Sequence, residues 1–381
     1  MDFPELIAKI GKGQKTWKDL TWEEAKQAMR WLIEGRATSA QVGAFLLAMR
    51  LKMESVTELA AFTSAAREYV PPVPVPDRLA LVDLPSYAGK QDTFHASIAA
   101  AIVAAAGGAT ILMHGYETLP GRPGPAAVLS ALGIPTGLEP KQAGEEVAAK
   151  GFAYLDLALY HPPIARFLEL RRELGLRSLF HPVARMLNPA RAGTQVIGLT
   201  HPPYFEKTAE ALKMLGCRRA LVLRGVEGDP ELSITAATKV LELTDERVVP
   251  LTLRPKDAGL PMASFREMAG FPPTQADREA TLLRRILHQE IRGGQRDWSI
   301  LNAALLLYAA GKAPSITAAA PLAQQALESG AAAQKLAALA DTHPLDRGPF
   351  DPSAGLGAGT LRAGRAGSRP SAISRTHETS A

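Results

Sequence analysis

The chain has 381 residues, of which 46% are hydrophobic and 21% are charged, as is ordinary for a soluble globular protein. This length suffices for two domains with separate cores. A single cysteine, Cys217, excludes an intrachain disulfide and a cysteine-based metal cluster, which fits a reducing cytoplasm. We expect Cys217 to be a small buried side chain rather than a nucleophile. The net charge of +5 permits a polyanionic partner without requiring one.

The N-terminal segment, residues 1–72, predicts a compact bundle of about four helices. Residues 1–13 lack an apolar core, so we expect no signal peptide. The run "PPVPVP" (Pro71–Pro76) cannot continue a helix and predicts a stiff linker. Capping boxes, in which a hydroxyl accepts from a first-turn amide while Glu or Gln reaches back, occur at Thr21 with Glu24, Thr38 with Gln41, and Ser55 with Glu58.

Residues 78–340 alternate short aliphatic runs with helical stretches, which predicts a mainly parallel sheet covered by helices on both faces. Ligands of such sheets bind at the C-terminal ends of the strands. Residues 96–113 carry no charge, but Gly107 and Gly108 interrupt them, so we expect a buried helix and strand rather than a membrane span. The expected strands are Leu79–Asp83, Ala109–His114, Phe152–Asp156, Gln195–Leu199, Ala220–Arg224 and Val248–Leu253.

The stretch Gly151–Ala190 carries the string "HPPIARFLELRRELGLRSLFHPVARMLNPA". Together with Gly35–Ser55, "LRPKDAGL" (Leu253–Leu260) and Ser299–Ile316, it resembles the anthranilate phosphoribosyltransferase family, which is glycosyltransferase family 3. The resemblance covers about residues 20–340. It implies an α/β fold with a small N-terminal helical bundle domain and a larger α/β domain with a mainly parallel central sheet. It also implies that parts of 160–185 join the helical domain and that this domain forms a homodimer contact.

The first predicted ligand loop, Asp83–Ser97, departs from the family. The resemblance places a Gly-Thr-Gly-Gly-Asp turn and "TFN" here, whose amides hold the diphosphate of phosphoribosyl diphosphate. This chain reads "DLPSYAGKQDTFHAS", in which Pro85 removes a donor and Tyr87 adds bulk. We therefore expect a degenerate donor loop, whose residues are Asp83, Tyr87, Gly89, Lys90, Thr93 and His95.

The second loop, "MHGYETLPGRPG" (Met113–Gly124), keeps His114 and Gly115 of the family's Lys-His-Gly-Asn. Met113 replaces the lysine and Tyr116 the asparagine, so a phosphate site loses its cation. The resemblance places His114, Gly115, Tyr116 and Arg171 in the acceptor cleft, with Arg171 on the arginine that holds the acceptor's carboxylate. Arg171 suits a nucleic-acid phosphate equally well, and an ion pair with a neighbouring Glu is the structural alternative.

The third loop, "RGVEGDPELS" (Arg224–Ser233), lies where the family has an Asp-Glu pair that holds magnesium. Pro230 takes the aspartate's place and Glu231 the glutamate's. Asp229, Glu227 and Glu231 are weak magnesium candidates with displaced geometry, and a solvated acidic turn is the alternative.

Basic residues concentrate in two segments and in the tail. Residues 161–191 hold six arginines against two glutamates. In the helix expected over Thr281–Trp298, Arg285, Arg292 and Arg296 recur at intervals of seven and four. If the helix persists, they lie on one side and could contact a phosphate backbone. The alternative is an ordinary solvated helix face. Residues 341–381 are expected to be a disordered tail. The candidate nucleic-acid contacts are Arg166, Arg172, Arg177, Arg285, Arg292 and Arg296.

Two functions fit this pattern. The first is non-sequence-specific binding of nucleic acid, in particular DNA, by a catalytically degenerate homodimer without a cofactor, similar to a nucleic-acid-binding paralogue branch of the family that lacks the phosphoribosyl diphosphate loop. The alternative is an active pentosyltransferase of tryptophan biosynthesis with an anthranilate-like acceptor, an altered donor loop and Mg²⁺. Both readings place the protein in the cytoplasm, with no membrane partner.

Overall fold

The computed structural model describes residues 2–13, 15–77, 79–87, 92–116, 123–226, 229–269 and 276–340. Gly89, Lys90 and Glu227 lie outside the described residues, as does the predicted tail. Among the described residues, no helix has both the length and the apolar character that crossing a bilayer requires.

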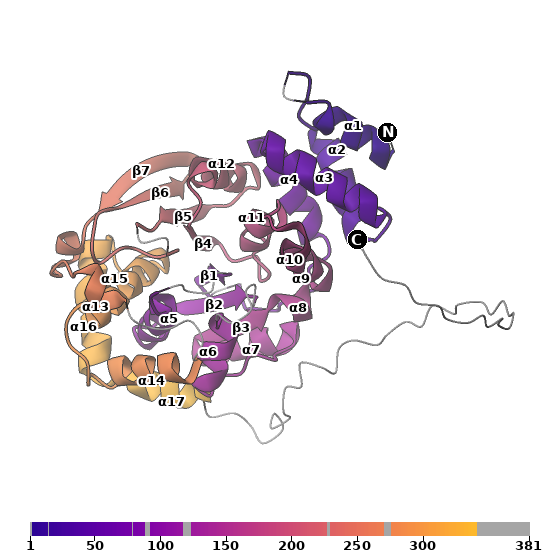
Figure 1. Cartoon of the computed structure of the whole chain (residues 1–381). Coiled ribbons are helices and arrows are strands. Elements are labelled where there is room, and N and C mark those ends of the chain that lie inside the picture. The colour runs from indigo at the N-terminus through magenta and orange to yellow at the C-terminus, as the bar shows by residue number, and fades with distance from the viewer. Residues whose placement is uncertain are drawn as a thin grey trace, which may run out of the picture. The chain divides into compact units, whose positions relative to one another are not determined.

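Four helices form the predicted N-terminal bundle (Figure 1): α1 (Phe3–Gly11), α2 (Trp22–Ile33), α3 (Ser39–Lys52) and α4 (Val56–Arg67). All three predicted capping boxes are confirmed, because each hydroxyl accepts from the predicted amide and each Glu or Gln bonds back to the cap. The core between the helices contains an edge-on contact of Phe45 with Phe62, with ring centroids 6.2 Å apart.

Seven strands form one sheet in the order β3-β2-β1-β4-β5-β6-β7. The first five are parallel to one another, whereas β6 pairs antiparallel with both β5 and β7. The mainly parallel sheet is therefore confirmed, and β6 is a strand that the sequence patterns did not predict. The bounds are β1 (Leu81–Ser86), β2 (Thr110–Gly115), β3 (Phe152–Asp156), β4 (Thr194–Leu199), β5 (Arg219–Arg224), β6 (Thr238–Thr244) and β7 (Arg247–Leu253).

Alternate residues of each strand enter different cores, because successive side chains of a strand point to opposite faces. Ile111 and Met113 of β2 join one core, while Leu112 between them joins the other. The first core includes residues of α5 (Ala96–Ala106), α6 (Pro125–Ala131), α14 (Ala276–Leu287), α15 (Gly294–Ala309), α16 (Ile316–Glu328) and α17 (Ala331–Ala340).

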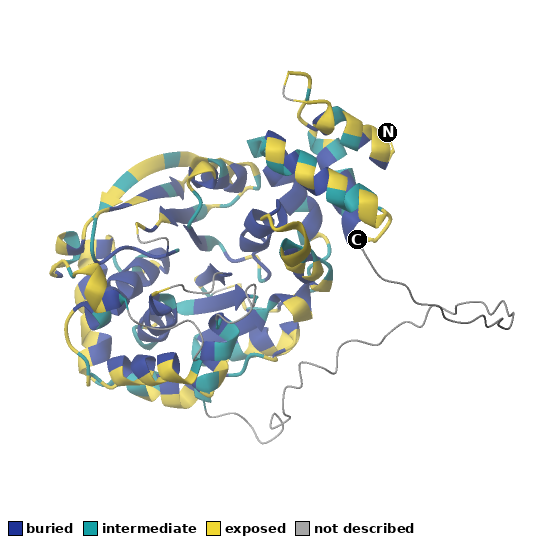
Figure 2. Ribbon diagram, viewed as in Figure 1, coloured by how far each residue is buried: buried dark blue, intermediate teal, exposed yellow. Residues whose placement is uncertain are grey.

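The second core joins the opposite face of the sheet to the helical bundle, and α4 packs against both α11 and α12. Figure 2 shows buried residues along the central strands and the inner sides of the helices, whereas the edge strand β7 is exposed or half-buried. The helices of this side are α7 (Pro140–Lys150), α8 (Leu157–Tyr160), α9 (Pro162–Glu169), α11 (Phe180–Arg185) and α12 (Phe205–Met214), and short α10 (Arg171–Leu174) follows α9. The short helix α13 (Phe265–Met268) lies on the other side, where it packs on α15 and Met268 joins the first core.

The first ligand loop starts three residues later than predicted. Strand β1 continues through Pro85 to Ser86, which pairs with Gly115 of β2. Strand β4 pairs with β1 only at Val82 and Asp83. Pro85 therefore has no neighbour in β4 to which a backbone N–H would have to donate, and proline is tolerated at this position. As predicted, α5 ends before Gly107 and Gly108, and β2 follows.

Candidate functional site

A hydrogen-bonded cluster lies at the C-terminal ends of β1 and β2. His114 Nδ1 lies 2.8 Å from the hydroxyl of Tyr87 and 2.9 Å from the hydroxyl of Tyr160, and the two hydroxyls are 2.9 Å apart. On the other side of the ring, His114 Nε2 lies 3.2 Å from Asp83 Oδ1. All four side chains are buried, and burial is the main cause that raises the pKa of both tyrosines.

The structure thus brings Asp83, Tyr87 and His114 together, but as a closed cluster. The side chain of Tyr87 points into the core that the sheet shares with the helical bundle, so it does not protrude into an open donor site. Since His114 is fully buried, it is unavailable to a substrate in this arrangement. Gly115 is held close to the carbonyl of Ser86, from which a Cβ would lie only 2.1 Å away.

Carboxylates of the chain occupy the N-terminus of α5. Glu231 Oε1 accepts from the amide of Ser97 at 3.0 Å. Glu279 Oε1 accepts from the amide of His95 and lies 2.7 Å from His95 Nδ1. A helix N-terminus attracts anions through its free amides and the helix dipole. Here internal carboxylates satisfy that attraction.

The loop after β5 covers the strand ends where a donor would bind. A Cβ on Gly198 would lie 1.9 Å from the carbonyl oxygen of Pro230, and one on Gly225 would lie 1.9 Å from that of Asp229, so only glycine permits this approach. Among the described residues, a cavity of about 20 Å³ lies between the ends of β1, β4 and β5 and the start of α5. Ligand pockets usually span about 300–1,000 Å³.

The described candidates, Asp229 and Glu231, do not form a magnesium site with each other, and the third candidate, Glu227, lies outside the described residues. Asp229 Oδ2 accepts from the hydroxyl of Thr93 at 2.6 Å, and Glu231 bonds to Ser97. Both carboxylates are buried, whereas Mg²⁺ requires octahedral oxygen ligands and usually retains several waters. Among the described residues, no group of three or more His, Cys, Asp or Glu side chains could hold a metal ion.

Arginines gather in a second place, which we call the arginine pocket: Arg50 of α3, Arg177, His181, Arg185, and His201 after β4. Arg177 Nη1 donates to Thr200 Oγ1 at 3.4 Å, and Arg185 Nη1 donates to the carbonyl of His181 at 2.9 Å. Burial, followed by the charges of Arg185 and Arg177, lowers the pKa of His181 to about 3.

No ion pair between described residues includes Arg50, Arg177 or Arg185. Arg177 is exposed at the mouth of the pocket, and Arg50 is half-buried. Burial and the charges of Arg171 and Arg50 lower the pKa of Arg177. The pocket therefore holds cationic N–H donors that no carboxylate of the described chain neutralises.

The predicted acceptor and basic residues of 160–180 lie on the helices beside this pocket. Tyr116 donates to Glu169 Oε1 at 2.5 Å. Arg171 is half-buried, while Arg166 and Arg172 are exposed. The structural alternative for Arg171, an ion pair with a neighbouring Glu, is absent from the described residues.

The prediction of a basic stripe along Thr281–Trp298 is wrong. Helix α14 ends at Leu287, and α15 begins at Gly294 after Gly293, whose φ of 78° breaks the helix. Arg296 is only 7% exposed and pairs with Asp297 at 3.1 Å and Glu328 at 2.9 Å. Arg285 contacts Glu290 at 3.3 Å, and Arg292 is exposed after the end of α14.

Sequence reasoning did not single out Arg50, His181 or Arg185. Arg50 lies in the helical bundle, more than 120 positions before the other members in the printed sequence. The only signal was the arginine density of 161–191, which includes Arg185. Cys217 is half-buried rather than fully buried as expected, and burial of its thiol raises the pKa of that group.

Comparisons with known proteins agree with this architecture. Residues 80–333 match the glycosyl transferase family, a/b domain, and residues 4–70 match its helical bundle domain. The chain is 34% identical to the anthranilate phosphoribosyltransferase of Persephonella marina, over 85% of this chain and 94% of the relative. It is 36% identical to that of Methylibium petroleiphilum, over 84% and 92%.

Solved structures show the same fold. The anthranilate phosphoribosyltransferase of Thermus thermophilus superposes with a TM-score of 0.79 at 33% identity, covering 89% of this chain and 98% of that one. The Saccharomyces cerevisiae protein in complex with PRPP and Mg gives a TM-score of 0.77 at 19% identity, covering 89% and 97%. The chain therefore belongs to the glycosyl transferase family that combines these helical bundle and a/b domains, and anthranilate phosphoribosyltransferases are its relatives.

Proposed function

We propose that this protein binds nucleic acid through its phosphate backbone, in particular DNA, and does not transfer phosphoribosyl groups. The observation that carries the proposal is the convergence of Arg50, Arg177 and Arg185 on one pocket without a paired carboxylate. Guanidinium groups bind phosphate oxygens through charge-assisted, often bidentate hydrogen bonds. Backbone contacts of this kind give binding without sequence preference.

The exposed arginines beside the pocket extend it into a path for a strand. Arg166 and Arg172 are exposed on α9 and α10, and the charges of Arg171 and Arg50 act on Arg177. A chain of phosphates suits such a row better than a single small anion, because each phosphate can meet a different guanidinium. Arg285, Arg292 and Arg296 have no part in this proposal.

The donor site supports the loss of catalysis. The N-terminus of α5 bonds to Glu231 and Glu279, and the cavity that the described residues form between the strand ends has a volume of about 20 Å³. A diphosphate entering there would have to displace two carboxylates and would meet their negative charge. Like charges at this distance in a partly buried site disfavour binding.

Phosphoribosyl transfer is the second candidate, and the relatives favour it, since proteins at 34–36% identity are named anthranilate phosphoribosyltransferases. Arg171 and His114 also stand where the family resemblance places acceptor-cleft residues. Calorimetry with phosphoribosyl diphosphate and Mg²⁺ separates the two candidates. Stoichiometric binding of the donor would favour the transferase, whereas the nucleic-acid proposal expects no saturable heat.

A direct test of the proposal titrates labelled single- and double-stranded DNA with the full chain at low ionic strength. We expect salt-sensitive binding that the double variant Arg50→Glu with Arg177→Glu weakens at least tenfold. Arg285→Glu is the matched control, because Arg285 is equally cationic but lies on α14 beside Glu290; it should change the affinity less than twofold. Absence of a DNA shift from the wild-type chain would refute the proposal.

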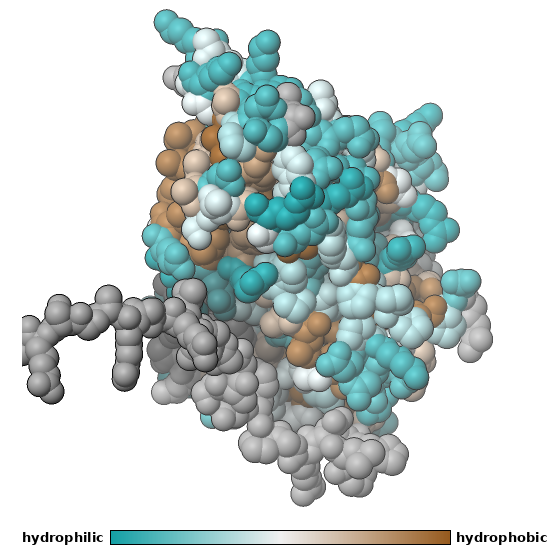
Figure 3. Space-filling view, turned by 90° about the vertical axis from the view of Figure 1, so that its right-hand side faces the viewer, coloured by the Kyte–Doolittle hydropathy of each residue, from teal (hydrophilic) through white to brown (hydrophobic). Residues whose placement is uncertain are grey.

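We further propose that the helical bundle forms a homodimer contact. Leu47 and Leu51 of α3 are 48% and 66% exposed, and their i, i+4 spacing places them on one side of the helix. In Figure 3, hydrophobic side chains gather on one part of the surface. Light scattering should give a dimer for the wild-type chain and a monomer for Leu51→Glu, and a monomeric wild-type chain would refute this contact.

A further inference from the structure

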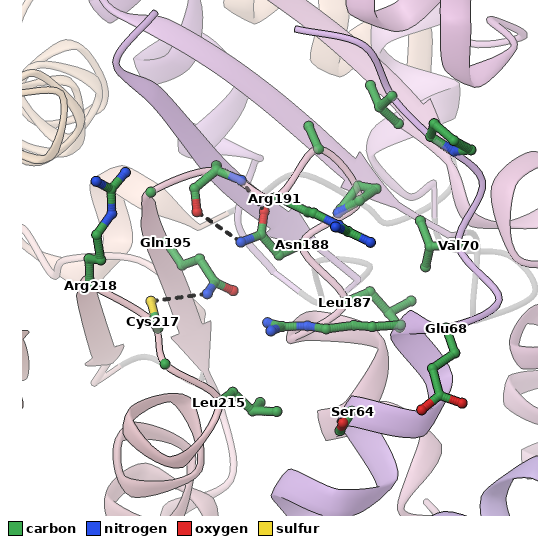
Figure 4. Close-up of a pocket in the computed structure, with 18 of the residues that line it drawn as sticks. Ser64, Glu68, Val70, Leu187, Asn188, Arg191, Gln195, Leu215, Cys217 and Arg218 are labelled. Carbon is green, nitrogen blue, oxygen red and sulfur yellow. Dashed lines mark hydrogen bonds between the residues drawn. The ribbon is translucent and has the colours of Figure 1, made fainter. Parts of the chain in front are cut away.

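A larger cavity, of about 710 Å³, lies at the N-terminal ends of β4 and β5, away from the strand ends that the predicted ligand loops follow (Figure 4). Its walls come from the end of α4 and the linker, from residues 187–193, and from the starts of β4 and β5. Gln195 lies near the first residue of β4, whereas Thr200 of the arginine pocket follows the last. The two sites are therefore separated by the length of a buried strand.

Three arginines give the cavity a cationic lining: Arg67, Arg191 and Arg218. Arg67 donates from Nε and Nη2 to the carbonyl of Met186, at 3.0 and 2.6 Å, which fixes its guanidinium at the wall. Burial is the main cause that lowers the pKa of Arg67; the charge of Asp83 opposes this and the charge of Arg191 adds to it. An anion between Arg67 and Arg191 would relieve their repulsion.

Arg218 approaches the backbone of Gly193 in the wall of the cavity. A Cβ added to Gly193 would lie 2.5 Å from Arg218 Nη2, so the guanidinium rests over the glycine. Glu68 also lines the cavity, but its carboxylate pairs with Lys26 at 2.9 Å and Arg30 at 2.8 Å. Figure 4 shows this carboxylate turned away from Gln195. The acidic residue of the wall is thus already neutralised.

Gln195 is the second, independent feature that points to a ligand. Its side-chain Nε2 donates to Cys217 Sγ at 3.1 Å. Its Oε1 has no hydrogen-bond partner in the described structure, although the residue is only 1% exposed. In Figure 4 this oxygen faces the interior of the cavity. A buried acceptor without a donor costs stability, and a ligand N–H would satisfy it.

We propose that this cavity binds a nucleoside monophosphate, with the phosphate held by the three arginines and a base N–H donating to Gln195 Oε1. The volume falls within the range of about 300–1,000 Å³ that small-molecule sites occupy, whereas inorganic phosphate would leave most of it empty. The site is independent of the proposed nucleic-acid function and of the donor site, since it shares no lining residue with the arginine pocket or with the strand ends around Glu231.

Calorimetry with guanosine monophosphate on the full chain tests this proposal, because its base presents N–H donors. We expect saturable one-to-one binding that Arg191→Gln and Arg218→Ala each weaken at least tenfold. Both arginines are exposed, so the substitutions should leave the fold intact, as circular dichroism would confirm. Arg247→Ala removes an exposed arginine at the start of β7 and should change the affinity less than twofold.

Two further ligands distinguish the contribution of the phosphate to binding from that of the base. Ribose 5-phosphate lacks the base donor and should bind at least tenfold more weakly than guanosine monophosphate, as should inorganic phosphate. Equal binding of inorganic phosphate would refute the nucleoside part of the proposal. Absence of saturable heat, or unchanged affinity in both arginine variants, would refute the site itself.

The arginine pocket provides a last control. Arg50→Glu with Arg177→Glu should leave the affinity for guanosine monophosphate unchanged, while Arg218→Ala should leave DNA binding unchanged. If the pocket variant abolished nucleotide binding, the nucleotide would be bound there, and the cavity proposal would fail while the proposed function survived.

Discussion

The carboxylate of Glu231 accepts a hydrogen bond from the backbone amide of Ser97 at 3.0 Å. This contact joins the loop after β5 to the first turn of α5, where a phosphate-binding member of the fold would need free amides. Glu279 of α14 makes the corresponding contact with His95. Two carboxylates of the chain itself therefore accept hydrogen bonds at the first turn of α5.

Two substitutions of Glu231 should lower the free energy of unfolding by different amounts. Glu231→Gln retains an acceptor but loses the charge that faces the helix dipole, which should cost about 0.3–1 kcal/mol. Glu231→Ala also leaves the amide of Ser97 unsatisfied, at about 1–3 kcal/mol. Urea unfolding would measure both values, with exposed Glu290→Gln as a near-neutral control. Equal stability of all three variants would show that the contact has no energetic role.

Alanine substitutions at Arg296 and at Arg292, four residues apart, should change the free energy of unfolding by different amounts. Arg296 is buried between Asp297 and Glu328, and breaking a buried ion pair costs about 3–5 kcal/mol because it leaves a charge uncompensated. Arg292 is exposed, so Arg292→Ala should stay within about 0.5 kcal/mol of the wild type. Urea unfolding of the two variants tests this difference. Similar effects would contradict the assignment of Arg296 to the interior.

Acid should destabilise the fold through His181. Its pKa is about 3 in the folded protein, below its ordinary value, so the unfolded chain binds the additional proton between about pH 6 and pH 3. The contribution of the neutral imidazole to the free energy of unfolding is fully present above about pH 6.5. Below that pH it falls by up to about 1.4 kcal/mol per pH unit.

Urea unfolding at pH 7 and pH 5 should therefore show a drop in the wild-type chain that His181→Gln reduces. Burial also lowers the pKa of His161 and His201, so these histidines add to the drop in both proteins, and only the difference between the wild type and His181→Gln reports on His181. An identical pH dependence in both proteins would exclude His181 as the cause. A bound polyanion should raise the pKa of His181, and DNA should therefore protect the wild-type chain against acid.

Local patterns predicted much of the fold. Capping boxes, the linker prolines and the aliphatic runs depend on residues close in sequence, and the structure places them as expected. Strand β6 was missed because "TKVLELT" (Thr238–Thr244) mixes charged residues into the alternation of an antiparallel strand, whereas the predictions relied on continuous aliphatic runs, which are typical of buried parallel strands.

The sites were harder to predict because they depend on distant contacts. Glu279 bonds to His95 across 184 positions, and Arg296 pairs with Glu328 across 32, so no local spacing indicates either partner. The spacing of Arg285, Arg292 and Arg296 indicated a stripe only while the helix was assumed to continue. The sequence also predicted that Tyr87 adds bulk in the donor loop, but its side chain instead joins the core beneath the helical bundle and bonds to His114 and Tyr160.

The proposal that Arg50 and Arg177 bind DNA phosphates is best tested by measuring how DNA affinity depends on salt concentration. Each arginine–phosphate pair that a substitution removes should reduce the steepness of log affinity against log salt by about 0.9 for duplex DNA. The account predicts a linear salt dependence for the wild-type chain and a slope that is shallower by this amount for Arg50→Ala and for Arg177→Ala, with Arg285→Ala unchanged. Wild-type binding with the same slope in all four proteins, or no binding at low salt, would contradict it.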